Sequence, residues 1–289
     1  MFKGISTQLF LEEKLSIERL KAIQDEGYDC IEILAIPPHF DYRDKQLVAK
    51  LAAWLRDQDS FLASIHTPFS TDYQALKVRQ WLSLSDPERL QRQKALDEIR
   101  LALEITEKVA CPVAVVHAGA PGDRHGLKLL EALYQSLEVL IPFAEARGVK
   151  IVLENIPNDL SRLDNLVRFL EDADLPSVGI CFDTGHSNLQ ANLCDEINIG
   201  GPWITAVHLH DNLGKRDEHL LPFEGTIHWE EVLQAFEKIQ YSGSWMLEVK
   251  AGEHDPRKLL GSARQVFDQF ELIIEQTRAK RQGALTSSS

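Results

Sequence analysis

Six apolar runs of this chain each end on a side chain that can bind a metal ion or move a proton. Each run has four to six residues, the length of a buried strand. The runs and the residues that follow them are Phe61–Ile65 before His66, Pro112–Val116 before His117, Val149–Leu153 before Glu154, Ser177–Phe182 before Asp183, Ile204–Val207 before His208, and Ser244–Leu247 before Glu248. Parallel strands present their carboxyl ends at one edge of a sheet, so the pattern indicates a parallel sheet with a functional site at that edge.

Helix-like segments separate the strand-like runs from end to end. Segment Ser16–Glu26, for example, carries Leu20 and Ile23 at three-residue spacing and stops at Gly27, a residue type that favours helix ends. Counting from Phe2–Ser6, the chain contains eight strand-plus-helix units. Strands on both sides of each helix favour a parallel sheet, and eight units favour its closure into a (β/α)8 TIM barrel, an α/β fold.

The barrel is expected to form a single catalytic domain over residues 1–279. The polar segment 280–289 is expected to be a disordered tail. Ser85 to Glu88 has the spacing of a capping box, which predicts a helix from there to about Val109. The preceding segment, residues 67–84, is predicted to be a long loop, and its aromatic residues are candidates for lid packing or for stacking on a ligand.

Composition limits the partners and the compartment. The net charge of −13 disfavours a nucleic-acid binder, because such proteins usually carry a basic face. No run of 18 apolar residues predicts a membrane span, and the N-terminus turns acidic by residue 12, unlike a signal peptide. The four cysteines show no CxxC spacing, as expected for free thiols. These features predict a cytoplasmic protein.

Four of the strand-end residues form a candidate metal site: Glu154, Asp183, His208 and Glu248. They follow the fifth to eighth strands, which are consecutive around half of the barrel mouth, so their side chains can converge. Three carboxylates and one imidazole suit Mn²⁺, Zn²⁺, Co²⁺ or Mg²⁺. A single such residue is more often a helix cap or an ion-pair partner, but all four in one register favour a metal.

Glu154 and Glu248 also form a candidate catalytic pair. The fifth and eighth strands of a closed ring of eight lie across the mouth from each other. Two carboxylates placed on opposite sides of a carbonyl compound can remove and return a proton, through an enediolate that a metal stabilises.

Several strings in this chain resemble the xylose isomerase-like superfamily of sugar phosphate isomerases and epimerases, which also includes endonuclease IV. They are ENIP at Glu154, CFDTGHSNL at Cys181–Leu189, VHLHDN at Val207–Asn212, DEHLLPFEGTIHW at Asp217–Trp229 and LEV at Leu247–Val249. The resemblance implies a divalent metal on the four residues above, with the two glutamates as the proton-transfer pair. It also implies a small carbohydrate substrate, and homo-oligomers are common among such barrels.

The resemblance extends to further residues. His186 matches a substrate-binding histidine of the epimerases, while Arg216 lies near the position of their substrate-binding arginine but at a different spacing. The chain also matches all nine ligand positions of the trinuclear zinc site of endonuclease IV, namely His66, His117, Glu154, Asp183, His186, His208, Asp217, His219 and Glu248. Thus His66, His117, His186, Asp217 and His219 are expected either to contact the substrate or to hold further metal.

Three enzymatic functions remain open from the sequence, besides that of a metal-binding protein without enzymatic activity. The first is a metal-dependent sugar, sugar phosphate or keto-acid isomerase or epimerase, which the motifs favour. The second is a dehydratase or another lyase on the same barrel, which would begin with the same proton abstraction and then expel water. The third is an endonuclease acting at abasic sites in DNA. The segment TPFSTDYQ after His66 departs from the nuclease pattern, and the acidic balance offers no DNA track.

Overall fold

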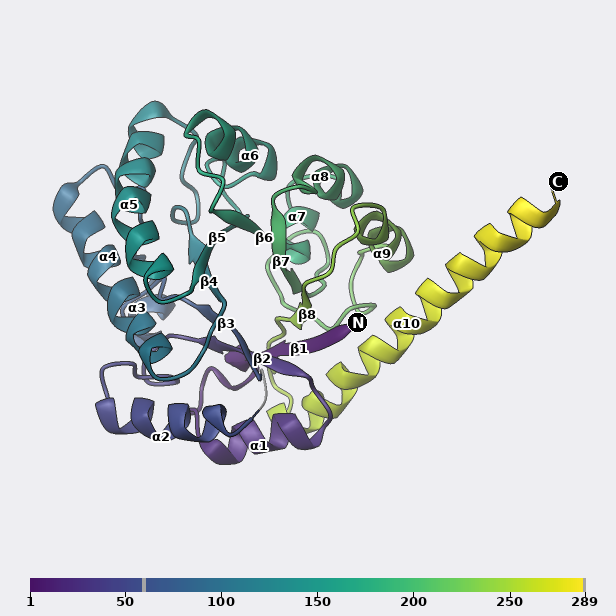
Figure 1. Cartoon of the computed structure of the whole chain (residues 1–289), viewed down its shortest axis with the longest axis horizontal. Helices are drawn as coiled ribbons and strands as arrows, with labels where there is room; N and C mark the ends of the chain where they lie inside the picture. The colour runs from purple at the N-terminus through teal and green to yellow at the C-terminus, as the bar shows by residue number, and fades with distance from the viewer. Residues whose placement is uncertain (59–60, 288–289) are drawn as a thin grey trace.

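A computed structural model describes residues 1–58 and 61–287, and in these residues eight parallel strands close into a barrel in chain order (Figure 1). The strands are β1 (Phe2–Ser6), β2 (Cys30–Leu34), β3 (Leu62–His66), β4 (Val113–His117), β5 (Lys150–Glu154), β6 (Gly179–Asp183), β7 (Ile204–Leu209) and β8 (Ser244–Leu247). Strand β1 closes the ring by pairing in parallel with β8, where Phe2 lies opposite Ser244. The (β/α)8 barrel predicted from the sequence is therefore confirmed.

Helices connect successive strands and cover the outside of the barrel (Figure 1). They are α1 (Ile17–Asp25), α2 (Lys45–Arg56), α3 (Tyr73–Lys77), α4 (Arg89–Leu103), α5 (Leu127–Glu145), α6 (Leu163–Asp172), α7 (Thr184–Asn188), α8 (Leu193–Gly200), α9 (Trp229–Lys238) and α10 (Pro256–Ser287), with 3₁₀ turns η1 (Thr7–Phe10) and η2 (Glu104–Glu107). Each long helix buries an apolar face against the strands, as Leu166 and Leu170 of α6 do. No helix in the described part of the chain is both long and apolar enough to cross a membrane.

The predicted capping box at Ser85 is wrong. Helix α4 begins at Arg89 after Glu88, whose side chain makes no capping hydrogen bond. The Ser85 hydroxyl instead contacts the Ser83 hydroxyl at 3.0 Å and donates to Asp123 Oδ2 at 3.4 Å. Tertiary partners thus replace the local cap that the sequence suggested.

The last helix is longer than the sequence indicated. Helix α10 continues to Ser287, where the sequence predicted a disordered tail over residues 280–289. Arg278 and Arg281 both pair with Glu237 of α9, and Lys280 lies 3.7 Å from Glu230. These ion pairs link residues 278–281 to α9 through exposed basic side chains, while the end of α10 projects away from the barrel (Figure 1); residues 288–289 lie outside the described residues.

Two short helices shape the mouth of the barrel. The segment 67–84, predicted as a loop, contains α3. Helix α7 starts directly after β6, with Asp183 as its N-cap residue. The carboxyl ends of β5, β6 and β7 and the first turn of α7 therefore lie together, and the site is built at this end.

Candidate metal and proton-transfer site

The four residues predicted as metal ligands come together at the barrel mouth. Glu154, Asp183, His208 and Glu248 are buried, and one ligand atom from each lies within 4.8 Å of those of the others. His208 Nδ1 lies 3.2 Å from Glu154 Oε1, 3.7 Å from Glu248 Oε2 and 3.9 Å from Asp183 Oδ2. Three carboxylates around one imidazole form a donor set that fits Mn²⁺, Zn²⁺ or Co²⁺.

Backbone and amide contacts hold Asp183 in place. Its Oδ1 accepts the His186 backbone N–H at 2.7 Å, which caps α7. Its own N–H donates to Asn155 Oδ1 at 2.7 Å, and the Asn155 side chain donates to the Asp183 carbonyl at 3.0 Å. Since Asn155 directly follows Glu154, this double contact fixes the ends of β5 and β6 relative to each other.

The two candidate catalytic glutamates differ in their proton affinity. Burial opposes ionisation of Glu154, but His208 together with hydrogen bonds from His117 and His186 holds its pKa well below the usual range. Burial, reinforced by the Glu154 charge, raises the pKa of Glu248 to about 7 although His208 acts in the opposite direction. Without a bound cation, Glu154 is therefore ionised near neutral pH, whereas Glu248 is close to half protonated.

His66 and His117 line one side of this cluster. Their Nε2 atoms lie 3.1 Å and 3.0 Å from the same atom, Glu154 Oε2. Phe69 stacks on the His117 ring with centroids 4.6 Å apart, and Trp81 lies behind Phe69 at 6.3 Å. The segment 67–84 thus adds an apolar wall next to Glu154, at the place where the sequence predicted a pocket-forming loop.

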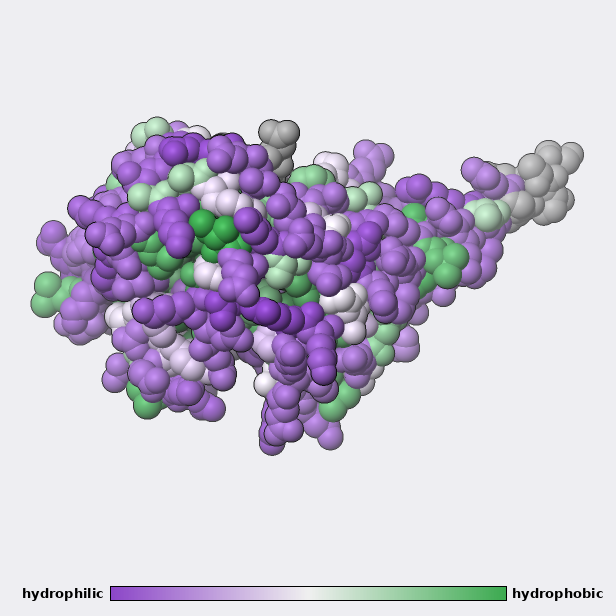
Figure 2. All heavy atoms as spheres, turned by 90° about the horizontal axis from the view of Figure 1, so that it is seen from below, coloured by the Kyte–Doolittle hydropathy of each residue, from purple (hydrophilic) through white to green (hydrophobic). Residues whose placement is uncertain are grey.

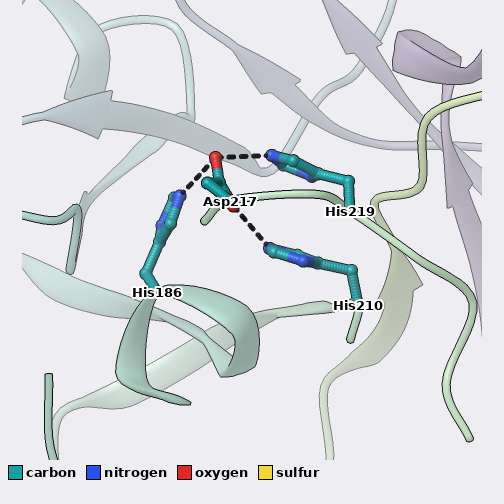
Figure 3. Close-up of side chains that lie close together, drawn as sticks. All are labelled: His186, His210, Asp217 and His219. Carbon is teal, nitrogen blue, oxygen red and sulfur yellow. Dashed lines mark hydrogen bonds and ion pairs between the residues drawn. The ribbon is translucent and has the colours of Figure 1, made fainter. Parts of the chain in front are cut away.

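A second group of possible ligands lies beside the first: His186, His210, Asp217 and His219 (Figure 3). Asp217 is central, at 3.4 Å from His186, 3.8 Å from His210 and 2.9 Å from His219. The His186 Nδ1 atom is 3.4 Å from Asp183, so the two groups share a border. The Asp217 side chain is 32% exposed, which places this group toward solvent.

Arg216 does not join either group. It is exposed in the segment between β7 and α9, and no described ion pair links its side chain to the cluster. Its contact with a substrate stays a prediction.

Two buried residues of the site were missed in the sequence. His210 donates from Nε2 to Asp183 Oδ2 at 3.0 Å and stacks on His219 at 3.9 Å. Glu32, in the middle of β2, accepts a hydrogen bond from His208 Nε2 at 3.1 Å. The available signals were a histidine two residues after His208 and an acidic residue inside the apolar run of β2.

With this site in place, comparison with known proteins gives the family. The chain belongs to the xylose isomerase-like TIM barrel family, whose model matches residues 20–270. It is 29% identical to an uncharacterized protein of Methanocaldococcus jannaschii over 96% of this chain and 92% of the relative. A second uncharacterized protein of that organism is 32% identical over 82% of this chain and 88% of the relative.

Solved structures share the fold. The crystal structure of a D-tagatose 3-epimerase-like protein superposes with a TM-score of 0.77 at 26% identity, covering 96% of this chain and 100% of that chain. An L-ribulose 3-epimerase superposes with a TM-score of 0.76 at 18% identity, covering 98% and 97%. At 18% identity the likeness is one of fold alone.

Proposed function

We propose that the protein is a divalent-metal-dependent isomerase or epimerase of a small carbohydrate. The observation that carries this proposal is the position of Glu154 and Glu248, which are two of four possible cation ligands in one buried cluster. The likeness to a D-tagatose 3-epimerase-like protein over the whole chain supports the same class of substrate.

The two glutamates would divide the proton transfer between them. Glu154, which is ionised near neutral pH, takes the proton from the carbon next to the substrate carbonyl, and the electron pair of that C–H bond becomes the double bond of an enediolate. Glu248 then delivers a proton to the opposite face of that carbon, giving an epimer, or to the neighbouring carbon, giving an isomer. A divalent cation bound by the cluster would supply Lewis-acid stabilisation of the negative charge on the substrate oxygen.

The surrounding residues would position the substrate. His66 and His117 contact the Glu154 carboxylate and would lie next to the reacting carbon of the substrate. Phe69 supplies an apolar surface beside His117. The second group around Asp217 has a donor set of three imidazoles and one carboxylate, which fits either a further cation or the hydroxyl groups of a substrate. Metal stoichiometry separates these two uses.

The test is solvent deuterium exchange. The protein loaded in turn with Mn²⁺, Co²⁺, Zn²⁺ and Mg²⁺ is incubated with a panel of ketoses and keto acids in D₂O. We expect deuterium at the carbon next to the carbonyl of at least one compound, and loss of this exchange in Asp183→Ala. Complete absence of exchange across the panel would overturn the proposal, and a product lighter by one water would identify a lyase instead.

The same preparation tests the nuclease alternative. Eight of the nine residues that match the trinuclear zinc site lie in three groups of possible cation ligands, and the ninth, His117, lies 3.0 Å from Glu154. About three zinc ions per chain together with nicking of an abasic-site duplex would replace the isomerase proposal with an endonuclease. About one ion per chain and no nicking would leave the isomerase proposal in place.

A further inference from the structure

Glu32 is a fully buried carboxylate inside the barrel, beneath the proposed metal site. It lies on β2, next to Ser64 in the register with β3, while its partner His208 lies on β7. A carboxylate in such an interior costs several kcal/mol unless other groups compensate its charge. Glu32 therefore requires an explanation that apolar packing does not give.

Both described contacts of Glu32 meet at one oxygen. Its Oε2 accepts the Ser64 hydroxyl at 2.8 Å and the His208 ring at 3.1 Å. Its Oε1 has no hydrogen-bond partner among the described residues. The orientation of the carboxylate is thus set by the serine on one side and the histidine on the other.

This contact decides which ring nitrogen of His208 can bind a cation. A carboxylate accepts hydrogen bonds, so the His208 atom that faces it, Nε2, carries the proton. The other nitrogen, Nδ1, lies 3.2–3.9 Å from the carboxylates of Glu154, Asp183 and Glu248, so its lone pair would be directed at a cation bound among them. Ligand histidines in metal sites are commonly held in this way by an outer carboxylate.

We propose that Glu32 is a positioning residue that fixes the tautomer and ring orientation of His208 for cation binding. The proposal rests on the metal site of the proposed function, but it does not depend on which carbohydrate is turned over. Ser64 acts with Glu32 by holding the carboxylate toward the ring.

Metal affinity provides the first test. The dissociation constants of Zn²⁺ and Mn²⁺ are measured by chelator competition for the wild type, Glu32→Ala, Glu32→Gln and Ser64→Ala. Loss of an outer partner typically weakens metal binding by about 10- to 100-fold, which is the loss expected for Glu32→Ala. Glu32→Gln keeps an acceptor oxygen for the ring, and Ser64→Ala keeps the carboxylate, so both are expected to lose less.

Glu196 offers a matched control. It is another buried glutamate that accepts a serine hydroxyl, that of Ser187, and it has no described contact with His208. We expect Glu196→Gln to bind Zn²⁺ like the wild type. Equal weakening in Glu196→Gln and Glu32→Ala would show a general effect of removing a buried carboxylate and would overturn the proposal.

The state of the His208 ring provides a readout that a merely structural role would not change. In ¹⁵N-histidine-labelled, Zn²⁺-loaded protein, the ring proton of His208 is expected on Nε2 with slow solvent exchange. Glu32→Ala is expected to speed that exchange, and Glu32→Gln to keep the proton on Nε2. A proton on Nδ1 in the wild type, or unchanged affinity and exchange in Glu32→Ala, would overturn the proposal; if Glu32→Ala does not fold, unchanged Zn²⁺ affinity in both Glu32→Gln and Ser64→Ala would overturn it.

The outcomes separate this proposal from the proposed function. Zn²⁺ binding that depends on Glu32, without deuterium exchange on any compound, would support the role of Glu32 and contradict the isomerase. Deuterium exchange that is lost in Asp183→Ala, together with a metal affinity that does not change in the Glu32 variants, would support the isomerase and contradict the role of Glu32. A wild-type protein that binds neither Zn²⁺ nor Mn²⁺ would overturn both.

Discussion

At the residue scale, Glu154 and Glu248 share one cluster but have different neighbours. Four histidines lie 3.0–3.5 Å from Glu154 and hold its pKa low, whereas three lie 3.5–4.0 Å from Glu248, whose pKa burial raises even though His208 acts in the opposite direction. Replacing either residue by Gln preserves its shape but removes its ability to carry a proton. We expect Glu154→Gln and Glu248→Gln each to lower the rate of deuterium exchange by about 100-fold or more at saturating metal. A loss below about threefold in either variant, with metal bound, would exclude that residue from proton transfer.

His39 gives a pH prediction that is separate from the metal site. Its Nδ1 donates to the Glu13 carbonyl and its Nε2 contacts the Thr7 hydroxyl, both in the interior. Burial lowers the pKa of His39 from 6.5 to about 4. The unfolded chain therefore binds a proton at His39 below about pH 6.5, whereas the folded protein binds it only near pH 4. The stability contributed by neutral His39 is thus present above pH 6.5 and is lost as the pH falls toward 4.

This loss of stability can be measured by comparing the wild type with a variant that lacks His39. When the pH is lowered from 7 to 5, protonation of His39 in the unfolded chain is expected to reduce the free energy of unfolding by about 2 kcal/mol. Urea unfolding of the wild type and of His39→Gln at both pH values isolates this amount, because the other titrating groups are common to both proteins. The stability difference between the two should shrink toward pH 5; a constant difference would show that His39 titrates normally in the folded protein.

At the element scale, the connection between β7 and α9 is organised around Asp211. This buried carboxylate accepts the backbone N–H groups of Asn212, Phe223 and Ile227 and the indole N–H of Trp229, at 2.8–3.1 Å. The same connection carries Asp217 and His219 of the second ligand group. A single side chain therefore determines the course of a segment that has little regular structure of its own.

Replacing Asp211 by Asn should loosen this connection. The amide NH₂ would face N–H donors, and at least one buried N–H group would lose its acceptor, which costs about 1–3 kcal/mol. We expect Asp211→Asn to lower the free energy of unfolding by that amount and to speed hydrogen exchange in residues 213–226. Asp195→Asn, at an exposed position of α8, is the control and should change neither quantity. Unchanged exchange in Asp211→Asn would show that other contacts fix the segment.

The elements also show what could be predicted from the sequence. The strand ends could be predicted because each candidate site residue directly follows its own apolar run, so local pattern and position coincide, as at His66 and Asp183. Glu32 could not be assigned to the site from the sequence, because its part in the site depends on a contact with His208, which is 176 residues away and on another strand. Ser85 failed as a helix cap for the same reason, since its hydroxyl is taken by Asp123 from another loop.

At the scale of the whole molecule, charged groups lie both on the surface and buried in the mouth of the barrel. The chain carries a net charge of −13, and hydrophilic residues cover most of the face in Figure 2, with apolar residues in smaller areas. In the mouth, by contrast, carboxylates and imidazoles are buried together within a few ångströms. The homo-oligomer expected from the sequence stays a prediction, since a single chain gives no test of it.

Gathering buried carboxylates stores repulsion that a cation would relieve, so metal should stabilise the whole barrel. A ligand that binds the folded state alone adds about 2.7 kcal/mol at 100 times its dissociation constant. For a domain of this size, each kcal/mol raises the melting temperature by about 2–4 °C, so an increase of about 5–10 °C is expected with saturating Mn²⁺ or Zn²⁺. Thermal unfolding with the metal and with a chelator measures it. Asp183→Ala should lose most of the increase and Glu196→Gln should keep it, whereas an equal increase in Asp183→Ala would place the stabilising cation elsewhere on the molecule.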